Sequence, residues 1–448
     1  MKTNSQHTYF FIGIGGVGMS ALARLCFNLR HVVYGYDRYP SDITKALVAE
    51  GIKVIHDNSL DALPDFLYKK HVRVIYSSAI ALSHPQLMFY IKQGNIVMKR
   101  SKFLALLCKN KTTLAVAGTH GKTTTCLILT HIFLKTKKSF TSLIGGFLEN
   151  NPSNLIKTGL DTFIVEADEY DRSFLQLYPT FACITSIDPD HLDVYKTKKE
   201  FINAFIEFSN QVDNELVFSH GLPFNGITFG IDVSADYRAT NLKKVKHGYR
   251  FDLNTPDDKF NDVCLNLIGR HNVMNTIAAI AMAEQAGLNA SDFISTLENF
   301  PGVYRRMNIY QLNDSIIIDD YAHHPSEIQS IYNTIRNFYP SYKNCVVFQP
   351  HLYSRTRDFM KEFSLVLSMF DEVIPLDIYP AREKPIEGIN SKILLDNISQ
   401  TKKRLMEKTK INSIIRKSGP KIFAILGAGD IGLEVKKLNL KKLKIEKE

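Results

Sequence analysis

The fold of this chain is decided by the stretch Ala-Gly-Thr-His-Gly-Lys-Thr-Thr at residues 117–124. It follows an apolar run, Leu114 to Ala117, and precedes a helical pattern that begins near Lys122. A glycine-rich turn between a strand and a helix presents backbone N–H groups that can bind phosphate. Lys122 would neutralise phosphate oxygens, and the Thr123 hydroxyl would coordinate magnesium. The stretch therefore predicts an α/β domain that binds ATP.

This loop is shorter than the standard phosphate loop, whose first glycine would fall at Val116. The form G-x-x-G-K-T indicates a narrower group of ATPases. The alternative is a tight strand–helix turn with an exposed lysine, but such a turn needs only the glycines and not the Lys-Thr-Thr that follows. We therefore predict an ATP phosphate site made by Gly118, Thr119, His120, Gly121, Lys122, Thr123 and Thr124.

Two acidic segments follow apolar strands farther along the chain. The run 162–165 leads into Glu-Ala-Asp-Glu-Tyr-Asp at 166–171, and the run 182–187 leads into Asp-Pro-Asp-His-Leu-Asp at 188–193. Either segment alone is typical of a solvated loop or a helix N-cap. Their occurrence together after a phosphate loop favours metal ligation, because carboxyl ends of parallel strands gather at one edge of a sheet. We predict Mg²⁺ there, with two ions as the expected number.

Asparagines and arginines supply further candidates. Asn272 and Asn275 are three residues apart before an Ala-rich helix and share one helical face, so they could grip adenine or orient phosphates. An N-cap with a solvent-facing asparagine is the alternative. The Arg305-Arg306 pair could bind phosphate through bidentate hydrogen bonds, although paired arginines are commonly surface charge.

Histidines follow two strands in the last third of the chain, in Asp319 to Pro325 and in Phe348 to Arg357. The adjacent pair His323-His324 is poorly placed to chelate one metal ion, because neighbouring side chains point in different directions. Hydrogen bonding is the better interpretation. Arg355 is suited to binding a carboxylate.

Two glycine patterns resemble dinucleotide-binding loops. The first is Gly13-x-Gly15-x-x-Gly18, with Asp37 after the strand-like run 32–36, and the second is Gly427-x-Gly429-x-x-Gly432. Two such loops in one chain show how weak the pattern is. We interpret the first as a diphosphate cradle and the second as a structural turn, while an NAD-dependent oxidoreductase remains an alternative.

Length and composition set the wider frame. The 448 residues, 45% of them hydrophobic, contain three strand–loop–helix beginnings, which predict three α/β domains at 1–108, 109–300 and 301–448. Part of the net charge of +10 lies in a lysine-rich tail. The remaining basic residues are not interleaved with aromatic residues, so the sequence does not indicate nucleic-acid binding. The apolar runs are too short for membrane insertion, and no secretory leader is evident, so we expect a cytoplasmic protein. The six cysteines are too dispersed for a structural zinc site.

The order and content of these motifs resemble the Mur ligases of peptidoglycan synthesis, over nearly the whole chain, and most closely their alanine-adding branch. The resemblance implies a Rossmann-like N-terminal domain, a P-loop-type central ATPase domain and a Rossmann-like C-terminal domain. It also implies the substrates UDP-N-acetylmuramate, L-alanine and ATP, with Mg²⁺ as the cofactor. In that family a substrate carboxylate attacks the ATP γ-phosphate, and the amine of the amino acid then attacks the resulting acyl phosphate.

The resemblance also implies roles in catalysis and ATP binding. Lys122 would stabilise the moving phosphoryl group, Thr123 and Glu166 would hold one magnesium ion, and His191 with Glu166 would hold the second. The remaining residues implied for the nucleotide and its transfer are Asn272, Asn275, Arg306 and Asp320.

The other two substrates have their own implied residues. His351 and Arg355 would position alanine. The UDP portion would be contacted by Gly13, Gly15, Gly16, Gly18, Asp37, His56, Ser77 and Arg100.

Two departures from the family pattern matter. Leu352 stands where many members have an arginine near the alanine carboxylate, and the segment 201–212 lacks the lysine that several sister ligases modify. The second departure is shared with the alanine-adding branch and favours His191 as a direct ligand. The alternatives are a recycling ligase that attaches a preformed tripeptide, and a nucleotide-gated binding protein without ligase activity. The sequence leaves open whether the protein is a monomer or a homodimer.

Overall fold

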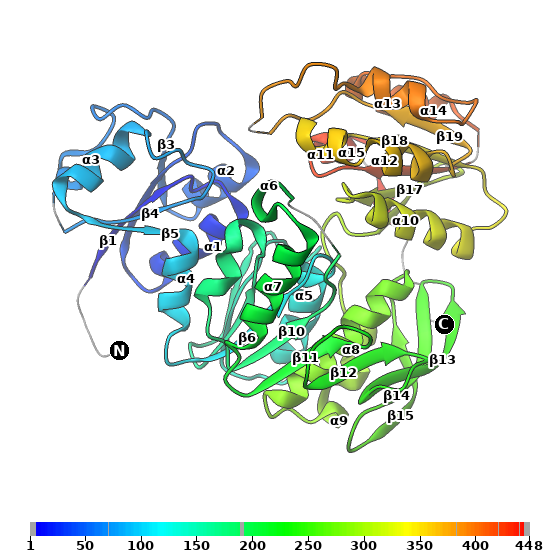
Figure 1. Cartoon of the computed structure of the whole chain (residues 1–448), viewed down its shortest axis with the longest axis horizontal. Helices are drawn as coiled ribbons and strands as arrows, with labels where there is room; N and C mark the ends of the chain where they lie inside the picture. The colour runs from blue at the N-terminus through cyan, green and yellow to red at the C-terminus, as the bar shows by residue number, and fades with distance from the viewer. Residues whose placement is uncertain are drawn as a thin grey trace. The chain divides into compact units, whose positions relative to one another are not determined.

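The computed structural model describes residues 6–69, 71–188, 192–381, 383–419, 421–438 and 440–442. The chain divides into two compact units. The first comprises residues 1–242, 250–265 and 272–300, and the second comprises 243–249, 266–271 and 301–448. Figure 1 colours the first from blue to yellow-green and the second mainly from yellow to red. None of the described helices has the length and apolar character needed to cross a bilayer.

The N-terminal part of the first unit is a parallel sheet with the strand order β3-β2-β1-β4-β5. Its strands are β1 (Thr8–Ile12), β2 (Val32–Tyr36), β3 (Lys53–Ile55), β4 (Arg73–Tyr76) and β5 (Ile96–Lys99). The connecting helices are α1 (Val17–Asn28), α2 (Asp42–Ala49), α3 (Pro85–Gln93) and α4 (Arg100–Cys108), with a 3-10 turn η1 (Asp65–Tyr68). The sheet reverses its strand order beside β1, so the loop after β1 opens at the switch point where ligands bind in such folds.

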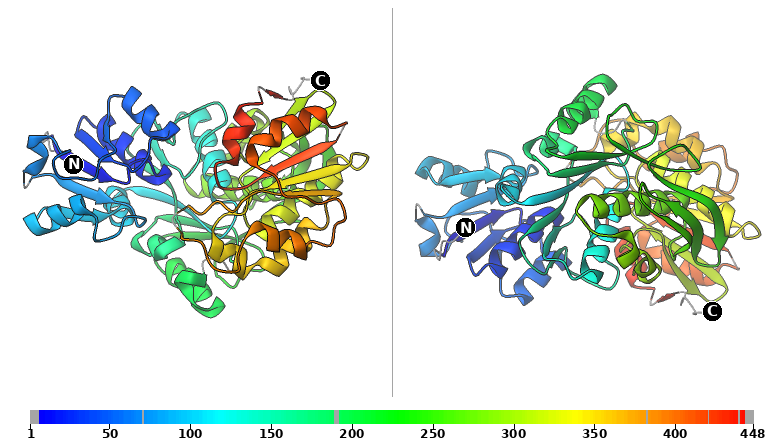
Figure 2. Two further views of the ribbon diagram at one scale, coloured as in Figure 1. Left: turned by 90° about the horizontal axis from the view of Figure 1, so that it is seen from above. Right: turned by 90° about the horizontal axis from the view of Figure 1, so that it is seen from below.

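The side chains of β1 alternate between the two faces of the sheet, which explains why helices cover both faces. Tyr9 and Phe11 belong to one buried cluster, whereas Phe10 and Ile12 belong to another. Successive side chains of a strand point to opposite faces, so both faces of this sheet must be covered. Figure 2 shows helices on both faces of the blue sheet.

The central sheet has ten strands in the order β15-β14-β13-β12-β11-β10-β6-β9-β7-β8. The strands are β6 (Thr112–Ala117), β7 (Phe140–Leu143), β8 (Leu155–Lys157), β9 (Thr162–Glu166), β10 (Phe181–Ile184), β11 (Glu215–Ser219), β12 (Ile227–Ile231), β13 (Tyr237–Val245), β14 (Gly248–Asn254) and β15 (Lys259–Leu265). The helical elements are α5 (Lys122–Lys135), η2 (Tyr170–Gln176), α6 (Leu192–Tyr195), α7 (Lys198–Ser209), α8 (Arg270–Gln285), α9 (Ala290–Phe293) and η3 (Ile294–Asn299).

Three neighbouring parallel strands of this sheet place the predicted site. β6 lies between β10 and β9, and both pairings are parallel. The phosphate loop follows β6, Glu166 ends β9, and the segment that leads to Asp188 follows β10. Because carboxyl ends of parallel strands meet at one edge, residues far apart in sequence come together there.

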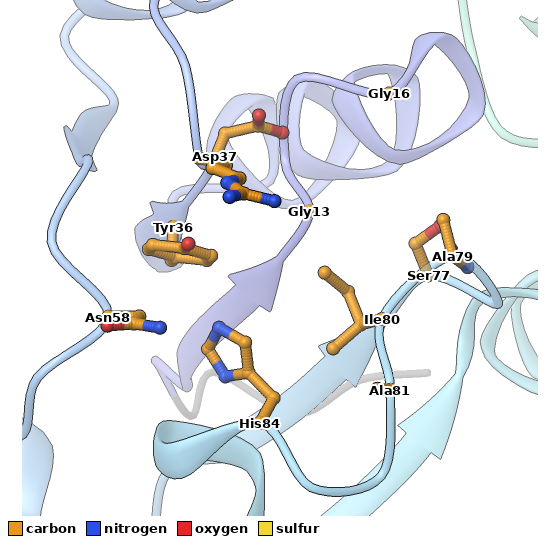
Figure 3. Close-up of a pocket in the computed structure, with 11 residues that line it drawn as sticks. Gly13, Gly16, Tyr36, Asp37, Asn58, Ser77, Ala79, Ile80, Ala81 and His84 are labelled. Carbon is orange, nitrogen blue, oxygen red and sulfur yellow. Dashed lines mark hydrogen bonds between the residues drawn. The ribbon is translucent and has the colours of Figure 1, made fainter. Parts of the chain in front are cut away.

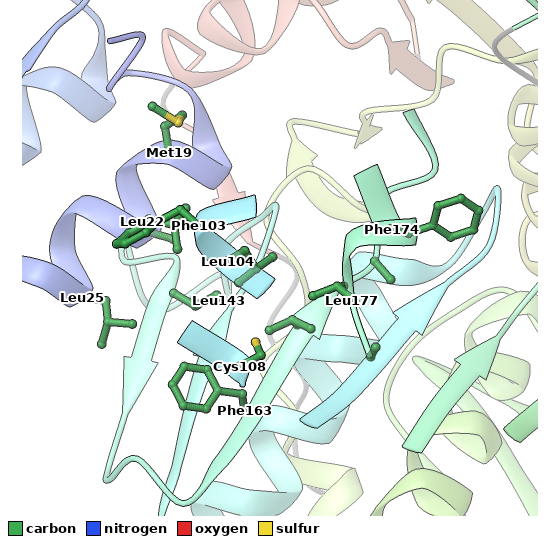
Figure 4. Close-up of a cluster of buried hydrophobic side chains, with 14 of the residues drawn as sticks. Met19, Leu22, Leu25, Phe103, Leu104, Cys108, Leu143, Phe163, Phe174 and Leu177 are labelled. Atoms are coloured by element: carbon green, nitrogen blue, oxygen red, sulfur yellow. The ribbon is translucent and has the colours of Figure 1, made fainter. Parts of the chain in front are cut away.

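The N-terminal and central sheets share one buried core. Met19, Leu22 and Leu25 of α1 belong to the same cluster as Leu143 and Phe163 of the central sheet. Figure 4 shows side chains of α4, among them Phe103, Leu104 and Cys108, within this cluster. The two sheets are therefore packed as one unit.

A polar contact also joins these two sheets. Arg24 of α1 is only 3% exposed, and its Nη1 donates to Asn154 Oδ1 at 2.6 Å. Its other edge pairs with Glu50 at 2.7 Å, while Asn154 donates to Ser20 Oγ at 3.1 Å. The buried guanidinium thus has a carboxylate and an amide as partners, which is the condition for keeping such a charge inside.

The second unit is built on a sheet with the order β19-β18-β20-β17-β16-β21. The strands are β16 (Asn308–Leu312), β17 (Ser315–Asp320), β18 (Asn344–Phe348), β19 (Glu372–Pro375), β20 (Ile422–Leu426) and β21 (Lys441–Lys442). The helical elements are α10 (Pro325–Phe338), α11 (Tyr353–Asp358), α12 (Met360–Leu367), α13 (Ser391–Asn397), η4 (Lys408–Lys410), α14 (Ile411–Lys417) and α15 (Ile431–Lys436). Strands β17 to β20 form the parallel core, and β16 is antiparallel to β17.

The predicted class, three α/β domains with Rossmann-like outer domains and a P-loop-type centre, is confirmed. In the second unit, Ile316 and Ile318 face one buried cluster and Ile317 faces the other, which is again the two-sided burial of a parallel sheet. The domain bounds at 108 and 300 remain predictions.

Candidate active site

The phosphate loop after β6 depends on its two glycines. Gly118 has φ +130° and Gly121 has φ +82°, a region that side-chain-bearing residues rarely adopt. A Cβ at Gly118 would overlap Thr185 Oγ1, and one at Gly121 would overlap Asn275 Oδ1. The glycines therefore allow the backbone to bend and let two side chains approach the loop.

The loop is pinned to the end of β10. Thr119 Oγ1 donates to the carbonyl of Asp188 at 2.7 Å, and the backbone N–H of His120 donates to Ser186 Oγ at 3.0 Å. Thr124 lies in the first turn of α5 and is buried. These contacts hold the loop in the shape that aims N–H groups of the helix start towards a phosphate.

Lys122 is the first residue of α5, and its side chain lies back over the loop. Its Nζ donates to the carbonyl oxygen of Gly118 at 2.5 Å and to Glu169 Oε2 at 2.6 Å. Burial, the largest single influence, would lower the pKa of Lys122, but the carboxylates of Glu169, Asp168 and Glu166 together outweigh it and the pKa is raised. Lys122 is therefore a fixed positive charge at the loop.

Glu166 is held at the end of β9 with one oxygen unsatisfied. Its Oε2 accepts the backbone N–H of Gly145 at 2.8 Å, and the Thr123 side chain is also hydrogen-bonded to its carboxylate. Its Oε1 is buried without a hydrogen-bond partner among the described residues. Burial raises the pKa of Glu166, and the hydrogen bonds from Thr123 and Gly145 and the charge of Lys122 offset this rise only in part. An orphaned carboxylate oxygen next to a threonine hydroxyl fits Mg²⁺, which prefers oxygen ligands.

His191, predicted to hold a second ion, lies outside the described residues, as does Asp190. Within the part of the chain that the structure describes, no group of three or more His, Cys, Asp or Glu side chains could hold a metal ion. Thr123 and Glu166 are therefore the predicted ligands that the structure brings together.

The two predicted asparagines lie near the start of α8. Asn272 and Asn275 are 6% and 7% exposed, and Asn275 Nδ2 donates to Asn272 Oδ1 at 3.4 Å. Because Asn275 also lies against Gly121, its amide stands at the phosphate loop. This places one of the two amides where an ATP contact is expected.

A cavity of about 570 Å³ opens beside the loop after β1. The cavity is lined by four of the residues predicted to contact the UDP portion, namely Gly13, Gly16, Asp37 and Ser77. Gly13 has φ +87°. Figure 3 shows Tyr36 and Asn58 on the side opposite Ser77 and Ala79, with His84 between them. The remaining residues around the cavity are Arg38, Ile80 and Ala81.

His84 is one of the polar side chains at this cavity that the sequence did not single out. Both of its ring nitrogens are buried without a hydrogen-bond partner in the described structure, and its ring lies 4.8 Å from that of Tyr36. Burial lowers the pKa of His84, so the ring is neutral at neutral pH. Neither Asn58 nor His84 belongs to a recognisable motif, and only the fold brings them to the glycine loop.

Three predicted contacts of the UDP portion have other partners. Asp37 Oδ2 accepts the backbone N–H of Gly15 at 2.7 Å, so this carboxylate braces the loop. His56 is exposed, with Nδ1 2.7 Å from the Asp37 carbonyl oxygen, and it does not line the cavity. Arg100 lies over Gly18 and pairs with Asp168 at 3.5 Å.

The second unit holds the candidates from the C-terminal region. Asp320 is 5% exposed and accepts backbone N–H groups from Met307 at 2.6 Å and Ala322 at 2.7 Å. Burial raises its pKa to about 6. Both of its oxygens thus hold loops of the chain. Arg306 pairs with Glu327 at 3.5 Å and lies over the Tyr321 ring.

The predicted amino-acid residues lie at the end of β18. The ring of His351 stacks on Tyr379 with centroids 5.7 Å apart, and Arg355 Nη1 is 3.5 Å from His351 Nδ1. His323 meets the same ring edge-on at 6.0 Å. Leu352, in place of the expected arginine, has φ +71°, which is unusual for a bulky residue. His351 and Arg355 are therefore brought together.

The second glycine pattern, after β20, is filled by the protein's own side chains. Arg305 donates to the carbonyls of Gly427 at 2.6 Å and Gly429 at 3.3 Å, and its Nε lies 3.2 Å from Asp319. Gln349 Oε1 accepts the backbone N–H of Ile431 at 3.0 Å. The turn is structural, as predicted.

Family models match all three parts of the chain. A model described as the Mur ligase family, catalytic domain, matches residues 8–112, the Mur ligase middle domain matches 116–283, and the Mur ligase glutamate ligase domain matches 305–429. Together with full-length relatives above 40% identity, these matches show that the chain belongs to the Mur ligase family.

Relatives within the family point to one branch. The UDP-N-acetylmuramate–L-alanine ligase of Flavobacterium psychrophilum is 43% identical over 99% of each chain, and that of Christiangramia forsetii is 44% identical over 96% of each. The crystal structure of UDP-N-acetylmuramate–alanine ligase from Thermotoga maritima matches 96% of this chain and 98% of its own, with a TM-score of 0.81 and 26% identity. A murein peptide ligase from Psychrobacter arcticus shares the fold, with a TM-score of 0.72, 20% identity and coverage of 97% of this chain and 98% of its own.

Proposed function

We propose that this chain is an ATP-dependent ligase that joins the carboxylate of UDP-N-acetylmuramate to the amine of L-alanine in peptidoglycan precursor synthesis. The observation that carries the proposal is the wall formed by Lys122, Thr123 and Glu166 in a chain that matches alanine ligases over 99% of its length. The wall supplies what phosphoryl transfer from ATP requires, namely a fixed cation and an unsatisfied carboxylate oxygen beside a phosphate loop.

The reaction has two steps in which atoms balance. An oxygen of the substrate carboxylate attacks the γ-phosphorus of ATP, the bond to the β-phosphate oxygen breaks, and ADP leaves. The neutral amine of alanine then attacks the acyl carbon, gives up a proton, and inorganic phosphate leaves as the amide forms. Lys122 faces the phosphate loop and stabilises the charge that develops on the transferred group.

Thr123 and Glu166 would hold Mg²⁺, and we assign His191 to a second ion. Bound Mg²⁺ supplies charge neutralisation of the phosphates and the attacking carboxylate. The chain contributes the geometry, because the Gly145 N–H fixes one oxygen of Glu166 and leaves the other for a ligand.

The substrates are assigned to candidate residues by their chemistry. The diphosphate and base of UDP-N-acetylmuramate would occupy the cavity beside the loop after β1, with Gly13 and Gly16 at the diphosphate and Tyr36, Asn58 and His84 at the base. His351 and Arg355 would position the alanine carboxylate, while Asn272 and Asn275 would contact ATP. Because ATP and UDP-linked sugars are cytoplasmic metabolites, we infer a cytoplasmic enzyme.

One assay tests this function. The purified chain receives UDP-N-acetylmuramate, ATP and Mg²⁺ together with L-alanine, L-serine, glycine or the preformed tripeptide, and product mass and phosphate release are measured. We expect L-alanine to support the highest kcat/KM. Preference for the tripeptide would assign the chain to the recycling branch, and phosphate release independent of any amine would contradict ligase activity.

A further inference from the structure

Glu169 is a buried carboxylate for which the proposed mechanism has no task. It belongs to the acidic segment 166–171 and is 2% exposed. Its Oε2 lies 2.6 Å from Nζ of Lys122, the residue whose side chain lies over the phosphate loop. A buried acid in contact with the central cation of an active site calls for a functional explanation.

The position of Glu169 is fixed by packing rather than by Lys122. The hydroxyl of Tyr195 donates to the Glu169 carbonyl at 2.5 Å. Phe174, in the turn that follows, stacks on Phe208 with centroids 5.0 Å apart and meets Phe205 at 5.1 Å. The backbone that carries Glu169 is therefore anchored in the core, and the flexible lysine side chain adapts to it.

The contact with Glu169 determines the direction in which the remaining N–H group of Lys122 can donate a hydrogen bond. An ammonium group has three N–H donors, and in the described structure Gly118 and Glu169 accept from two of them. The third donor is left for a phosphate oxygen. If Lys122 moved away from Glu169 when nucleotide bound, a buried carboxylate would lose a hydrogen-bonded cation at 2.6 Å, which is costly. The contact should therefore persist in the nucleotide complex.

We propose that Glu169 is a positioning residue for phosphoryl transfer, which holds Lys122 over the phosphate loop with one N–H aimed at the transferred phosphate. Gly118 supplies the second support, so the ammonium group is held between a carbonyl and a carboxylate. The inference rests on the proposed use of ATP and adds to it the residue that orients the lysine.

Two substitutions test the contact. Glu169→Gln removes the charge and keeps the size, whereas Glu169→Asp keeps the charge but is too short by one methylene to reach Nζ. Since misplacement by about 1 Å can cost about 100-fold in rate, we expect both variants to lose between about 10- and 100-fold in kcat. The KM for ATP should change by less than about threefold, because ground-state binding depends mainly on the loop backbone. Wild-type kcat in either variant would overturn the proposal.

Asp171→Asn is the matched control. Asp171 lies in the same acidic segment but pairs with Lys99 at 3.1 Å, with both side chains exposed. Its loss should leave kcat and KM for ATP unchanged. A fall in kcat equal to that of Glu169→Gln would show that the charge of the segment matters rather than the contact with Lys122, which would also overturn the proposal.

A crystal structure of the full chain with ADP and Mg²⁺ tests the geometry without turnover. We expect Lys122 Nζ to contact a phosphate oxygen while staying within hydrogen-bond distance of Glu169. Separation of the two side chains in that complex would refute the positioning role. If the wild-type chain binds ADP but does not ligate alanine, the proposed reaction fails while the inference about Glu169 can still be tested.

Discussion

The loops after β1 and β20 share the pattern G-x-G-x-x-G but meet different surroundings. Gly13 and Gly16 line a cavity of about 570 Å³. In contrast, a Cβ at Gly432 would lie 2.5 Å from Arg305 Nε, and one at Gly429 would lie 2.5 Å from Gln349 Oε1. The same glycine pattern thus borders an open cavity in one sheet and a packed turn in the other. The difference depends on whether side chains of the protein itself fill the space beside the loop and hydrogen-bond to its backbone.

The largest effect is expected at the phosphate loop after β6, and it tests whether this loop and the loop after β1 bind separate substrates. Lys122→Ala should lower the ligation rate by at least about 1,000-fold, because a cation at the transferred phosphate is lost. Binding of UDP-N-acetylmuramate should stay within about threefold of wild type, since its proposed cavity does not include Lys122. Product formation is followed by mass spectrometry and binding by calorimetry. Loss of both together would contradict separate sites.

The packed loop after β20 should be destabilised by Arg305→Met. This change removes the partner of buried Asp319 and the donors to two carbonyls, so we expect the free energy of unfolding to fall by about 3 kcal/mol. Urea unfolding measures it. Arg306→Met, at the neighbouring and more exposed arginine, should change that free energy by less than about 0.5 kcal/mol. Equal stability of the two variants would mean that Arg305 does not support the loop.

Alanine scanning of the glycines sharpens the comparison. At Gly13, with φ +87° and Ser77 Cβ 3.1 Å from the added methyl, alanine should raise the KM for UDP-N-acetylmuramate about tenfold. At Gly427, alanine should instead destabilise the fold by about 2 kcal/mol, because the methyl would lie 2.8 Å from the carbonyl of Gln349. Steady-state kinetics and thermal unfolding distinguish the two outcomes. A raised KM for this substrate in Gly427→Ala would be inconsistent with a purely structural turn.

The smallest effect is expected at His84. His84→Leu should weaken UDP binding about threefold to tenfold, since one neutral hydrogen bond is lost. Because burial lowers the pKa of His84 below its ordinary value, the ring takes up its proton at a lower pH than an exposed histidine does, so the wild-type affinity should stay constant as the pH falls from about 8 to 7. Calorimetric titration with UDP at several pH values checks this. A steep change near neutral pH would mean that the ring titrates at its ordinary value.

Much of the site followed from the sequence because its residues belong to contiguous motifs. The phosphate loop follows β6 and Glu166 ends β9, and parallel pairing of β6 with β9 brings the two together. The family resemblance supplied the reaction. The fold class and the ligase function are confirmed, whereas the individual site residues remain predictions.

What the sequence could not provide depends on contacts between distant segments. Arg305 and Arg306 look alike in sequence, yet Arg305 is 7% exposed because its acceptors, at residues 319, 427 and 429, are assembled only by the sheet. Likewise, four acidic side chains occupy 166–171, and their pairing is set by a turn in which Asp171 and Arg172 have positive φ. No local pattern says which carboxylate meets Lys122.

The buried pair of Arg24 and Asn154 limits how this protein can be taken apart. A cut near residue 108 would leave a guanidinium that is 3% exposed without its amide partner and would uncover Leu22 and Phe103 of the shared core. The part of the chain before residue 108 is therefore poorly suited to exchange between relatives. A chimaera that keeps α1 and the loop around Asn154 from one parent should express and fold, whereas one that separates them should aggregate.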